Sequence, residues 1–378
     1  MGTRMRQPDN CYNKFEFWLA GIPSISGRKK IYLKSLFPQL EELYQLNIKQ
    51  IQKIPSLTER EKEHLKTSKQ ISDFKLEKEL EYCIQNQIKL ILWEDKGYPS
   101  RLKHIYNPPY GLYYRGSLPK ETEPAIAIVG ARNCSLYGKK IAEAVGFHLA
   151  KSGVSIISGM ALGIDGASHQ GALQAEGKTY GILGSGIDVC YPARNKILYE
   201  KLQIDGGVIS EYPPHTQPLA MFFPQRNRII SGLSDAVIIV EAKEKSGSLI
   251  TADFALEQGK EIYAVPGRID DILSQGTNQL IRQGAGIFLS IEDFQKEMNI
   301  FIDSMKTSKE KQKIVLAKLE RLVYHCLGLN PKNLEELILD TGLSFAELIE
   351  NLESLREKGC ILEVYKNYFI RTDSSDFV

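Results

Sequence analysis

The fold of this chain is decided by the stretch Ala125-Ile126-Ala127-Ile128-Val129-Gly130-Ala131-Arg132. Five apolar residues without polar alternation, followed by a glycine turn, are typical of a strand in a parallel sheet that is covered on both faces. Comparable apolar runs lie at residues 154–157, 179–183, 208–209, 236–240 and 261–265, with helical patterns between them. Strands that alternate with helices predict βαβ units, and therefore an α/β fold with a doubly wound, mainly parallel sheet.

Length and composition limit the classes of protein to consider. The chain has 378 residues and a net charge of +2, so we expect two or three domains, and any nucleic-acid site must be a local basic surface. No apolar run approaches the roughly 20 residues of a membrane span, and the polar start lacks the apolar core of a secretory signal, so we expect a cytoplasmic protein. The cysteines form no CxxC pair, which predicts reduced thiols and neither disulfides nor a zinc site. They are Cys11, Cys83, Cys134, Cys190, Cys326 and Cys360.

The segments before the sheet have a different pattern. Residues 15–74 have helical periodicity, with Phe15, Trp18, Leu19 and Ile22 on one apolar stripe. Two turns in this segment precede lysine- and arginine-bearing helices, as in a helix-hairpin-helix. They lack the glycines usual in such hairpins, so we favour a packing module over a DNA-binding one. Prolines between residues 98 and 116 exclude a continuous helix, and we expect extended chain packed along the next domain.

The C-terminal segment predicts a winged helix. Residues 315–371 carry three helical patterns and then a β-hairpin pattern. The helix that would enter a major groove, near residues 344–358, carries Glu347, Glu350 and Glu353. These acids would face DNA phosphates at a cost, so we favour a protein contact or a packing role over duplex binding.

The residues that follow each strand form the candidate site, because ligands of an open parallel sheet bind outside the carboxyl ends of its strands. Gly130 lets the backbone approach an anion, and Arg132 can grip a phosphate through two hydrogen bonds. Ser246-Gly247-Ser248 opens a helix, whose N-terminus favours anions. Several such loops at one edge predict a polyanion site. Its candidate residues are Gly130, Arg132, Gly159, Lys178, Gly184, Phe223, Arg226, Asn227, Arg228, Lys243, Gly247 and Ser248.

One run within this set suits a single nucleic-acid strand. It reads Phe222-Phe223-Pro224-Gln225-Arg226-Asn227-Arg228-Ile229-Ile230, and it offers cations for phosphates and an aromatic face for a base. We expect Phe222 in the core, whereas Phe223 is free to stack on a base. We also expect one of the two arginines to be structural, paired with Asp235 or Glu211.

Evidence for catalysis is weak. Asp165 and His169 stand four residues apart and could share a metal, but no third ligand is evident, so helix capping and a buried histidine are favoured. The loop at Gly130 departs from the GxGxxG fingerprint, and no GxxxxGK[ST] loop is present, which disfavours NAD and ATP chemistry. We therefore predict no catalytic residue, no metal and no cofactor.

Taken together, these motifs closely resemble the DprA (Smf) family of DNA-processing proteins in bacterial transformation. The resemblance covers the whole sheet domain and rests on residues 128–132, 158–169, 184–192, 210–213, 223–230 and 241–251, with weaker matches at 98–99 and 112–116. It implies a non-enzymatic protein of competence and homologous recombination that binds single-stranded DNA, usually as a homodimer, and loads the RecA recombinase. It further implies that Arg132 and Lys178 hold phosphates, and that Arg226 to Arg228 line a groove with Phe223 beside a base. Family members often carry a basic residue where this chain has Ala220, which puts one phosphate contact in doubt.

The sheet also resembles that of the LOG-type nucleotide phosphoribohydrolases, which is the enzyme alternative. Alignment of their threonine with Thr251 places Phe254 where their catalytic glutamate stands, and the nearest acid is Asp253. This departure argues against hydrolysis, although another acid could substitute.

The patterns and the resemblance together predict a domain plan. We expect an N-terminal helical domain (SAM or helix-hairpin-helix type) at residues 1–80 and a Rossmann-like DNA-binding domain at 81–295. A linker at 296–312 and a winged-helix (DML1-like) domain at 313–378 follow. A protein partner of the winged helix is expected, and a dimer surface is expected around Leu280, Ile281 and Phe288.

Overall fold

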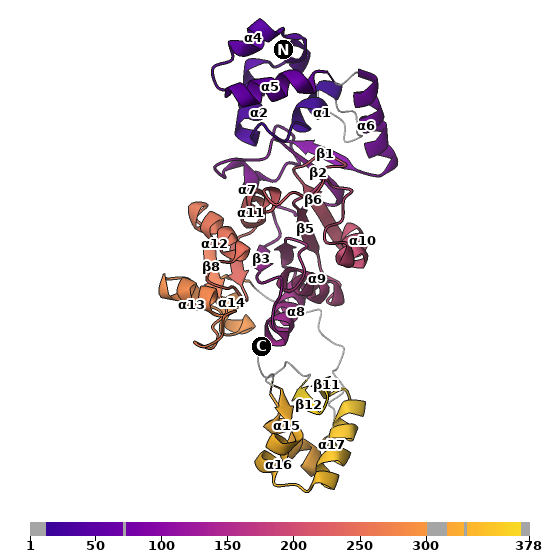
Figure 1. Ribbon diagram of the computed structural model, residues 1–378, viewed down its shortest axis with the longest axis vertical. Helices are drawn as coiled ribbons and strands as arrows, with labels where there is room; N and C mark the ends of the chain where they lie inside the picture. The colour runs from indigo at the N-terminus through magenta and orange to yellow at the C-terminus, as the bar shows by residue number, and fades with distance from the viewer. Residues whose placement is uncertain (1–12, 71–72, 301–315, 329–330, 372–378) are drawn as a thin grey trace.

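The computed structural model describes residues 13–70, 73–300, 316–328 and 331–371. Figure 1 shows these residues as helices at one end of the long axis, a mixed sheet with flanking helices in the middle, and a small domain at the other end. Cys11 and most of the expected linker lie outside the described residues. No described helix is both long and apolar enough to span a bilayer.

The middle of the molecule is built on one nine-stranded sheet with the order β1-β2-β6-β5-β4-β3-β7-β8-β9. Strands β3 to β9 pair in parallel with their neighbours, while β2 pairs antiparallel with β6 and with β1. The strands are β1 (Lys89–Leu92), β2 (Gly111–Gly116), β3 (Ala125–Val129), β4 (Ser155–Ser158), β5 (Thr179–Leu183), β6 (Gly206–Ser210), β7 (Ala236–Ile239), β8 (Glu261–Ala264) and β9 (Gly286–Ile287). All six predicted strands are present, and the predicted α/β class is confirmed.

Helices cover both faces of this sheet. They are α8 (Leu136–Lys151), α9 (Ile164–Gln174), α10 (Lys196–Asp205), α11 (Phe222–Gly232), α12 (Gly247–Glu257), α13 (Gln275–Arg282) and α14 (Ile291–Glu297), with a 3-10 turn at Ala193–Asn195. Alternate residues of β3 enter different cores. Ile126 and Ile128 pack with residues of α8 and α9, whereas Ala127 and Val129 pack with residues of α11 and α12. Burial on both faces explains why this strand is continuously apolar.

The bridging segment is more regular than expected. Instead of extended chain alone, it forms β1, the short helix α7 (Ser100–Lys103) and β2. Tyr113 and Tyr114 of β2 stand opposite Ser210 and Ile209 of β6. The prolines separate these elements without preventing them, so the segment extends the sheet by two antiparallel strands.

The N-terminal segment is helical, as predicted. It comprises α1 (Lys14–Ala20), α2 (Gly27–Leu36), α3 (Leu40–Gln45), α4 (Ile48–Gln52), α5 (Glu59–Ser68) and α6 (Asp73–Gln85). All four residues of the predicted apolar stripe are buried. Several basic residues are satisfied internally: Lys29 pairs with Glu61, and Lys30, only 5% exposed, donates to the Ala20 carbonyl. These contacts agree with a packing module.

The N-terminal helices contact the sheet domain at α2 and at α6. At the first turn of α2, Gly27 approaches the Pro108 carbonyl so closely that a Cβ would lie 1.9 Å from the oxygen. At α6, the Tyr82 hydroxyl donates to the Asp188 carboxylate, which also accepts from the backbone N–H of His215. Asp188 and His215 belong to the loops that follow β5 and β6, so the N-terminal helices rest on the carboxyl edge of the sheet.

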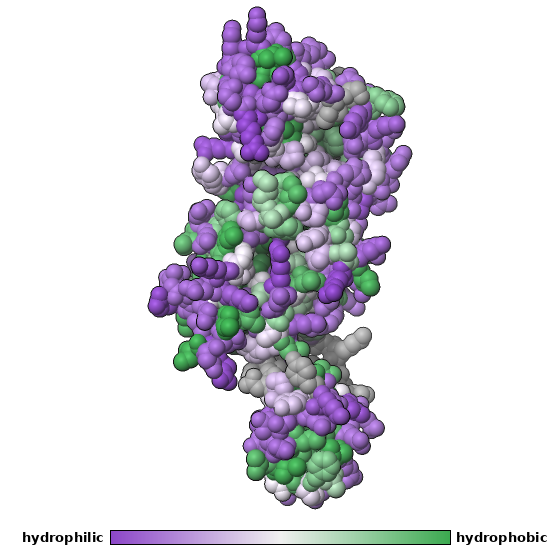
Figure 2. All heavy atoms as spheres, in the orientation of Figure 1, coloured by the Kyte–Doolittle hydropathy of each residue, from purple (hydrophilic) through white to green (hydrophobic). Residues whose placement is uncertain are grey.

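The C-terminal part is a winged helix. It contains α15 (Lys318–Cys326), β10 (Lys332–Asn333), α16 (Leu334–Thr341), α17 (Phe345–Glu357), β11 (Ile361–Tyr365) and β12 (Tyr368–Arg371), with sheet order β10-β12-β11. The predicted helix at 344–358 is α17, capped by Ser344, and Glu347, Glu350 and Glu353 are exposed on it. Apolar residues gather on the lower part of this domain in Figure 2.

Gly27→Ala tests the close approach of α2 to the bridging segment. The added Cβ meets backbone and cannot be relieved by rotation of a side chain. We expect a loss of about 1–3 kcal/mol in the free energy of unfolding, measured by urea denaturation. Gly328→Ala, whose Cβ meets no atom within 4 Å, is the control. Equal stabilities of the two variants would contradict this packing.

Candidate nucleic-acid interface

A groove of about 700 Å³ lies at the carboxyl edge of the parallel strands. Its walls come from the loops after β3, β4, β5 and β7 and from one face of α11, which follows β6. The convergence expected from strand topology is therefore present. Of the predicted residues, those that line this groove are Gly130, Arg132, Phe223, Arg226, Asn227, Lys243, Gly247 and Ser248.

Arg132, which is exposed, and Phe223, which is half-buried, lie against each other in the groove. The Arg132 guanidinium carbon lies 5.3 Å from the centre of the Phe223 ring, and the Tyr191 ring lies 5.5 Å from the same ring. Phe222, in contrast, is buried against Tyr212. Since Arg132 is exposed and no ion-pair partner of it lies within the described residues, it remains available to an anion.

The start of α12 forms another part of the groove wall. Ser246 caps this eleven-residue helix by accepting from the Ser248 N–H, as its position in the sequence suggested. Lys243 and Lys245 are exposed directly before the cap. Their positive charges add to the helix dipole at this end.

Arg226 reaches the groove wall but is only 4% exposed. Its Nη1 donates to the carbonyls of Gly159 and Ile182, at the ends of β4 and β5. Burial lowers the pKa of this guanidinium to about 10, while the nearby Asp165 carboxylate acts in the opposite direction. Arg226 therefore stays charged at neutral pH and braces the sheet, and it is one of the structural arginines.

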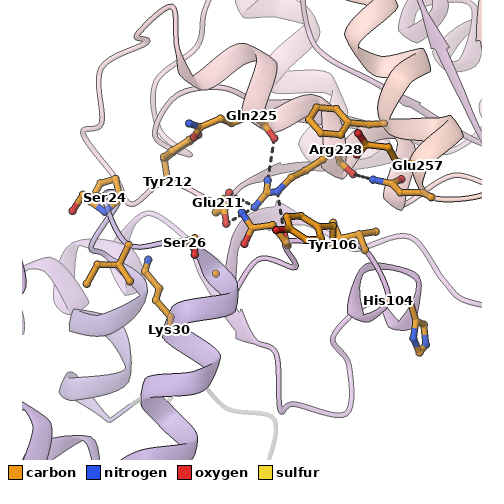
Figure 3. A pocket seen from close by; sticks show the side chains of 17 residues that line it. Ser24, Ser26, Lys30, His104, Tyr106, Glu211, Tyr212, Gln225, Arg228 and Glu257 are labelled. Carbon is orange, nitrogen blue, oxygen red and sulfur yellow. Dashed lines mark hydrogen bonds and ion pairs between the residues drawn. The ribbon is translucent and has the colours of Figure 1, made fainter. Parts of the chain in front are cut away.

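Arg228 lies outside the groove, contrary to expectation. Two helical residues span about 200° of rotation, so Arg226 and Arg228 point from opposite faces of α11. Arg228 donates to both carboxylate oxygens of Glu211 at 2.8 Å and to the carbonyls of Asn107 and Gln225. Figure 3 shows this network in a separate cavity of about 360 Å³ beside Lys30. The expected pairing of one arginine with Glu211 is present, whereas Asp235 pairs with Arg101.

Lys178 also lies outside the groove, although the sequence predicted it as a site residue. It precedes β5 and so lies at the amino end of that strand, at the edge opposite the groove. There its ammonium pairs with Glu123 at 2.9 Å. A residue before a parallel strand cannot join a site built from the residues that follow the strands.

The predicted glycines serve packing as well as access. A Cβ at Gly184 would lie 2.8 Å from the Phe223 ring, and one at Gly159 would lie 2.6 Å from the Asp165 carboxylate. A Cβ at Gly130 would meet Ile164 at 2.7 Å, whereas Gly247 faces open space. Gly184 thus positions the aromatic ring, and Gly130 allows α9 to approach β3.

Asn227 joins the two helices of the groove. Its side-chain Nδ2 donates to the Gly247 carbonyl at 3.2 Å, and the residue is 9% exposed. It fixes the first turn of α12 against α11, and this contact sets the width of the groove at that point.

Asp165 and His169 do not form a metal site. Asp165 accepts from the backbone N–H groups of Gly159 and Ala161, while burial raises the pKa of its carboxyl group. His169 is fully buried with its Nδ1 2.6 Å from the Thr179 hydroxyl, and burial lowers its pKa to about 3. No group of three or more potential metal ligands occurs among residues 13–70, 73–300, 316–328 and 331–371.

The residues that align with the threonine and the catalytic glutamate of the LOG-type hydrolases lie in α12, together with the nearest acid. Thr251 lines the groove, Asp253 is exposed away from it, and Phe254 lines the separate cavity of Arg228. Within the described chain, Asp165 is the one acid among the residues that line the groove, and two backbone donors already bind one oxygen of its carboxylate.

Tyr191 and Lys245 line the groove but were not among the predicted site residues. Tyr191 follows β5 and directly precedes Pro192, and Lys245 directly precedes the serine cap of α12. Both could have been found by including every aromatic or basic residue in the loops at the carboxyl edge.

The fold and the groove define a Rossmann-like domain with exposed cations and aromatic rings at the carboxyl edge of its sheet. The sequence profile of the DNA recombination-mediator protein A family matches residues 89–299. The match covers more than half of the chain, so the chain belongs to this family, as the resemblance to DprA and Smf proteins implied.

Curated relatives agree with this assignment. The chain is 46% identical over 203 residues to DNA processing protein DprA of Streptococcus pneumoniae, covering 54% of this chain and 72% of the relative. It is 44% identical over 212 residues to DprA of Bacillus subtilis, covering 56% of this chain and 71% of the relative.

Solved structures show the same fold. The crystal structure of Streptococcus pneumoniae DprA superposes with a TM-score of 0.66 at 36% identity, covering 76% of this chain and 98% of that one. A Helicobacter pylori DprA structure, described for its single-stranded DNA binding mode, superposes with a TM-score of 0.52 at 31% identity. It covers 56% of this chain and 96% of its own length.

His169 predicts a pH dependence of stability. Because its pKa is near 3 in the folded state and about 6.5 when unfolded, only the unfolded chain binds a proton between these values. Stability from this residue is therefore present above pH 6.5 and falls by about 1.4 kcal/mol per pH unit below it. His169→Asn lacks this proton, so the stability advantage of wild type should shrink between pH 6.5 and pH 4. A constant difference in urea denaturation across this range would contradict the assignment.

Arg228→Gln tests the structural role of the second arginine. It leaves the half-buried Glu211 carboxylate without its cation, so we expect a loss of roughly 3 kcal/mol in the free energy of unfolding. Arg268→Gln, which breaks an exposed pair with Asp270, should change stability little. Equal effects of the two substitutions in urea denaturation would show that the Arg228 network does not brace the fold.

Proposed function

We propose that this protein binds single-stranded DNA in the groove at the carboxyl edge of its sheet, without cleaving it, and loads the RecA recombinase onto the bound strand. The observation that carries this proposal is the position of Arg132. Its exposed guanidinium has no ion-pair partner in the described chain and lies against the aromatic ring of Phe223.

The cations suit a phosphate backbone. Arg132, Lys243 and Lys245 are exposed on the groove walls, while the net charge of the whole protein is only +2. A local positive groove on a nearly neutral protein favours electrostatic binding at one place on the surface. We expect affinity to fall with salt, because each phosphate contact releases counterions.

The aromatic rings favour an unpaired strand over a duplex. Phe223 and Tyr191 can stack only with bases whose faces are accessible, and every base has such a face. The expected binding therefore tolerates changes of sequence.

The groove favours binding over hydrolysis. General acid–base catalysis needs an ionisable side chain within reach of the reacting atoms. Asp165, the acid on the groove wall, accepts two backbone hydrogen bonds and is buried. Phe254 stands where the LOG-type glutamate would be.

Membership in the DNA recombination-mediator protein A family supports three further parts of the proposal. The protein loads RecA, it acts in competence, and it forms a homodimer. The dimer surface expected around Leu280, Ile281 and Phe288 needs one residue replaced by its neighbours. Phe288 is buried within the protomer, whereas Ile287 and Leu289 at the β9 edge are 47% and 69% exposed. We propose that the dimer forms at this edge.

The domain plan completes the proposal. We assign residues 1–80 to helical packing, 81–295 to DNA binding, 296–312 to the linker and 313–378 to the winged helix. The exposed acids of α17 favour a protein partner for that last domain over duplex DNA.

Arg132→Glu tests the groove. Because the exposed Arg132 side chain makes no hydrogen bond or ion pair within the described residues, the substitution should lower the affinity for a single-stranded oligonucleotide by roughly 30-fold or more and leave the melting temperature nearly unchanged. Lys151→Glu is the matched control. Lys151 is exposed at the far end of α8, about 24 Å of helix away from the groove.

Fluorescence anisotropy with single-stranded and duplex oligonucleotides provides the measurement. Equal affinity for the two forms would overturn strand selectivity, and equal losses in both charge reversals would overturn the groove assignment. Release of free base from nucleoside monophosphates would instead favour a hydrolase.

A further inference from the structure

The groove has two chemically different walls. The residues of α12 and of the loop before it bring Lys243, Lys245 and the helix N-terminus. The loops after β5 and β6 and helix α11 bring the rings of Tyr191 and Phe223 and an uncharged rim at residues 218–221, which reads Pro-Leu-Ala-Met. We call this part the aromatic wall. Arg132 lies over the Phe223 ring.

Tyr191 is presented to the groove without a structural hydrogen bond. Its side chain is 46% exposed, and its hydroxyl has no hydrogen-bond partner within the described residues. The ring planes of Tyr191 and Phe223 are tilted by 40° with centres 5.5 Å apart. Two adjacent rings in this arrangement provide stacking faces for more than one base.

Lys245 likewise makes no ion pair within the described residues. It is exposed, and it directly precedes the Ser246 cap of α12. Its ammonium therefore adds to the positive end of an eleven-residue helix, where a phosphate is favoured. The rim at Ala220 provides no charge.

We propose that Tyr191 and Lys245 form a second nucleotide subsite beside the one at Phe223 and Arg132, a proposal that rests on single-stranded DNA being the ligand. The base of this second nucleotide stacks on Tyr191, and its phosphate binds Lys245 at the start of α12. The strand thus runs with its bases toward the aromatic wall and its phosphates toward the α12 wall.

Lys245→Gln tests the phosphate half of the subsite. The slope of log affinity against log salt concentration should become shallower by about 0.7 for single-stranded DNA, the change for one lost phosphate contact. Lys151→Gln, at the opposite edge of the sheet, should keep the wild-type slope. Identical slopes for the two variants would overturn the assignment of Lys245.

Tyr191→Leu tests the base half, because it keeps apolar bulk and removes the ring. We expect an affinity loss of about 5- to 150-fold for an oligonucleotide with all its bases and an unchanged salt slope. Tyr191→Phe should restore binding. On an oligonucleotide in which abasic sites replace the bases, wild type and Tyr191→Leu should bind equally. A loss that is as large on the abasic strand would show that Tyr191 only supports the fold.

Wild-type protein gives an independent check should Tyr191→Leu fail to fold by circular dichroism. Removal of two adjacent bases from a short oligonucleotide must then weaken binding more than removal of either one. An equal loss would overturn the second base site. If wild type binds single strands and Arg132→Glu does not, but Lys245→Gln and Tyr191→Leu resemble wild type, the second subsite fails while the proposed function stands.

Discussion

The arrangement of the groove depends on the buried guanidinium of Arg226. A charge that is removed from water must be compensated by hydrogen bonds or by an opposite charge. Arg226 obtains two carbonyl acceptors from the ends of β4 and β5 and an electrostatic partner in Asp165. Because these acceptors belong to the sheet, the arginine fixes α11 across the strand ends, and Phe223 on the same helix is then held over Gly184.

The two faces of helix α11 border different parts of the molecule. The face with Phe223 and Arg226 borders the groove, and the face with Arg228 borders the junction with the N-terminal helices. Arg228 donates to the Asn107 carbonyl, and the Asn107 side chain accepts from the Arg28 N–H at the start of α2. The DNA-binding proposal and the docking of the N-terminal helices therefore depend on one helix, which explains why the two arginines behave so differently.

Much of the fold could be predicted because burial on both sheet faces leaves a direct pattern in the sequence, as in residues 125–129. The start of α12 at Ser246-Gly247-Ser248 was also predictable, since a serine cap acts on a neighbouring N–H group. The wrong predictions for Arg228 and Lys178 have a different cause. Their placement depends on helix rotation and on which end of a strand a residue occupies, and neither is visible in a list of nearby cations. Strand β2 was expected only as extended chain, and β1, which lies before the prolines of this segment, was not predicted.

The most direct test of the account is to locate the bound strand by photocrosslinking, with bromodeoxyuridine-substituted single-stranded DNA and mass spectrometry of the adducts. The account predicts adducts on the peptides that contain Tyr191 and Phe223, and loss of these adducts when excess unlabelled single strand competes. Adducts confined to the N-terminal helices at residues 13–70 or to the winged helix at residues 331–371 would contradict it, because the strand would then bind away from the carboxyl edge of the sheet.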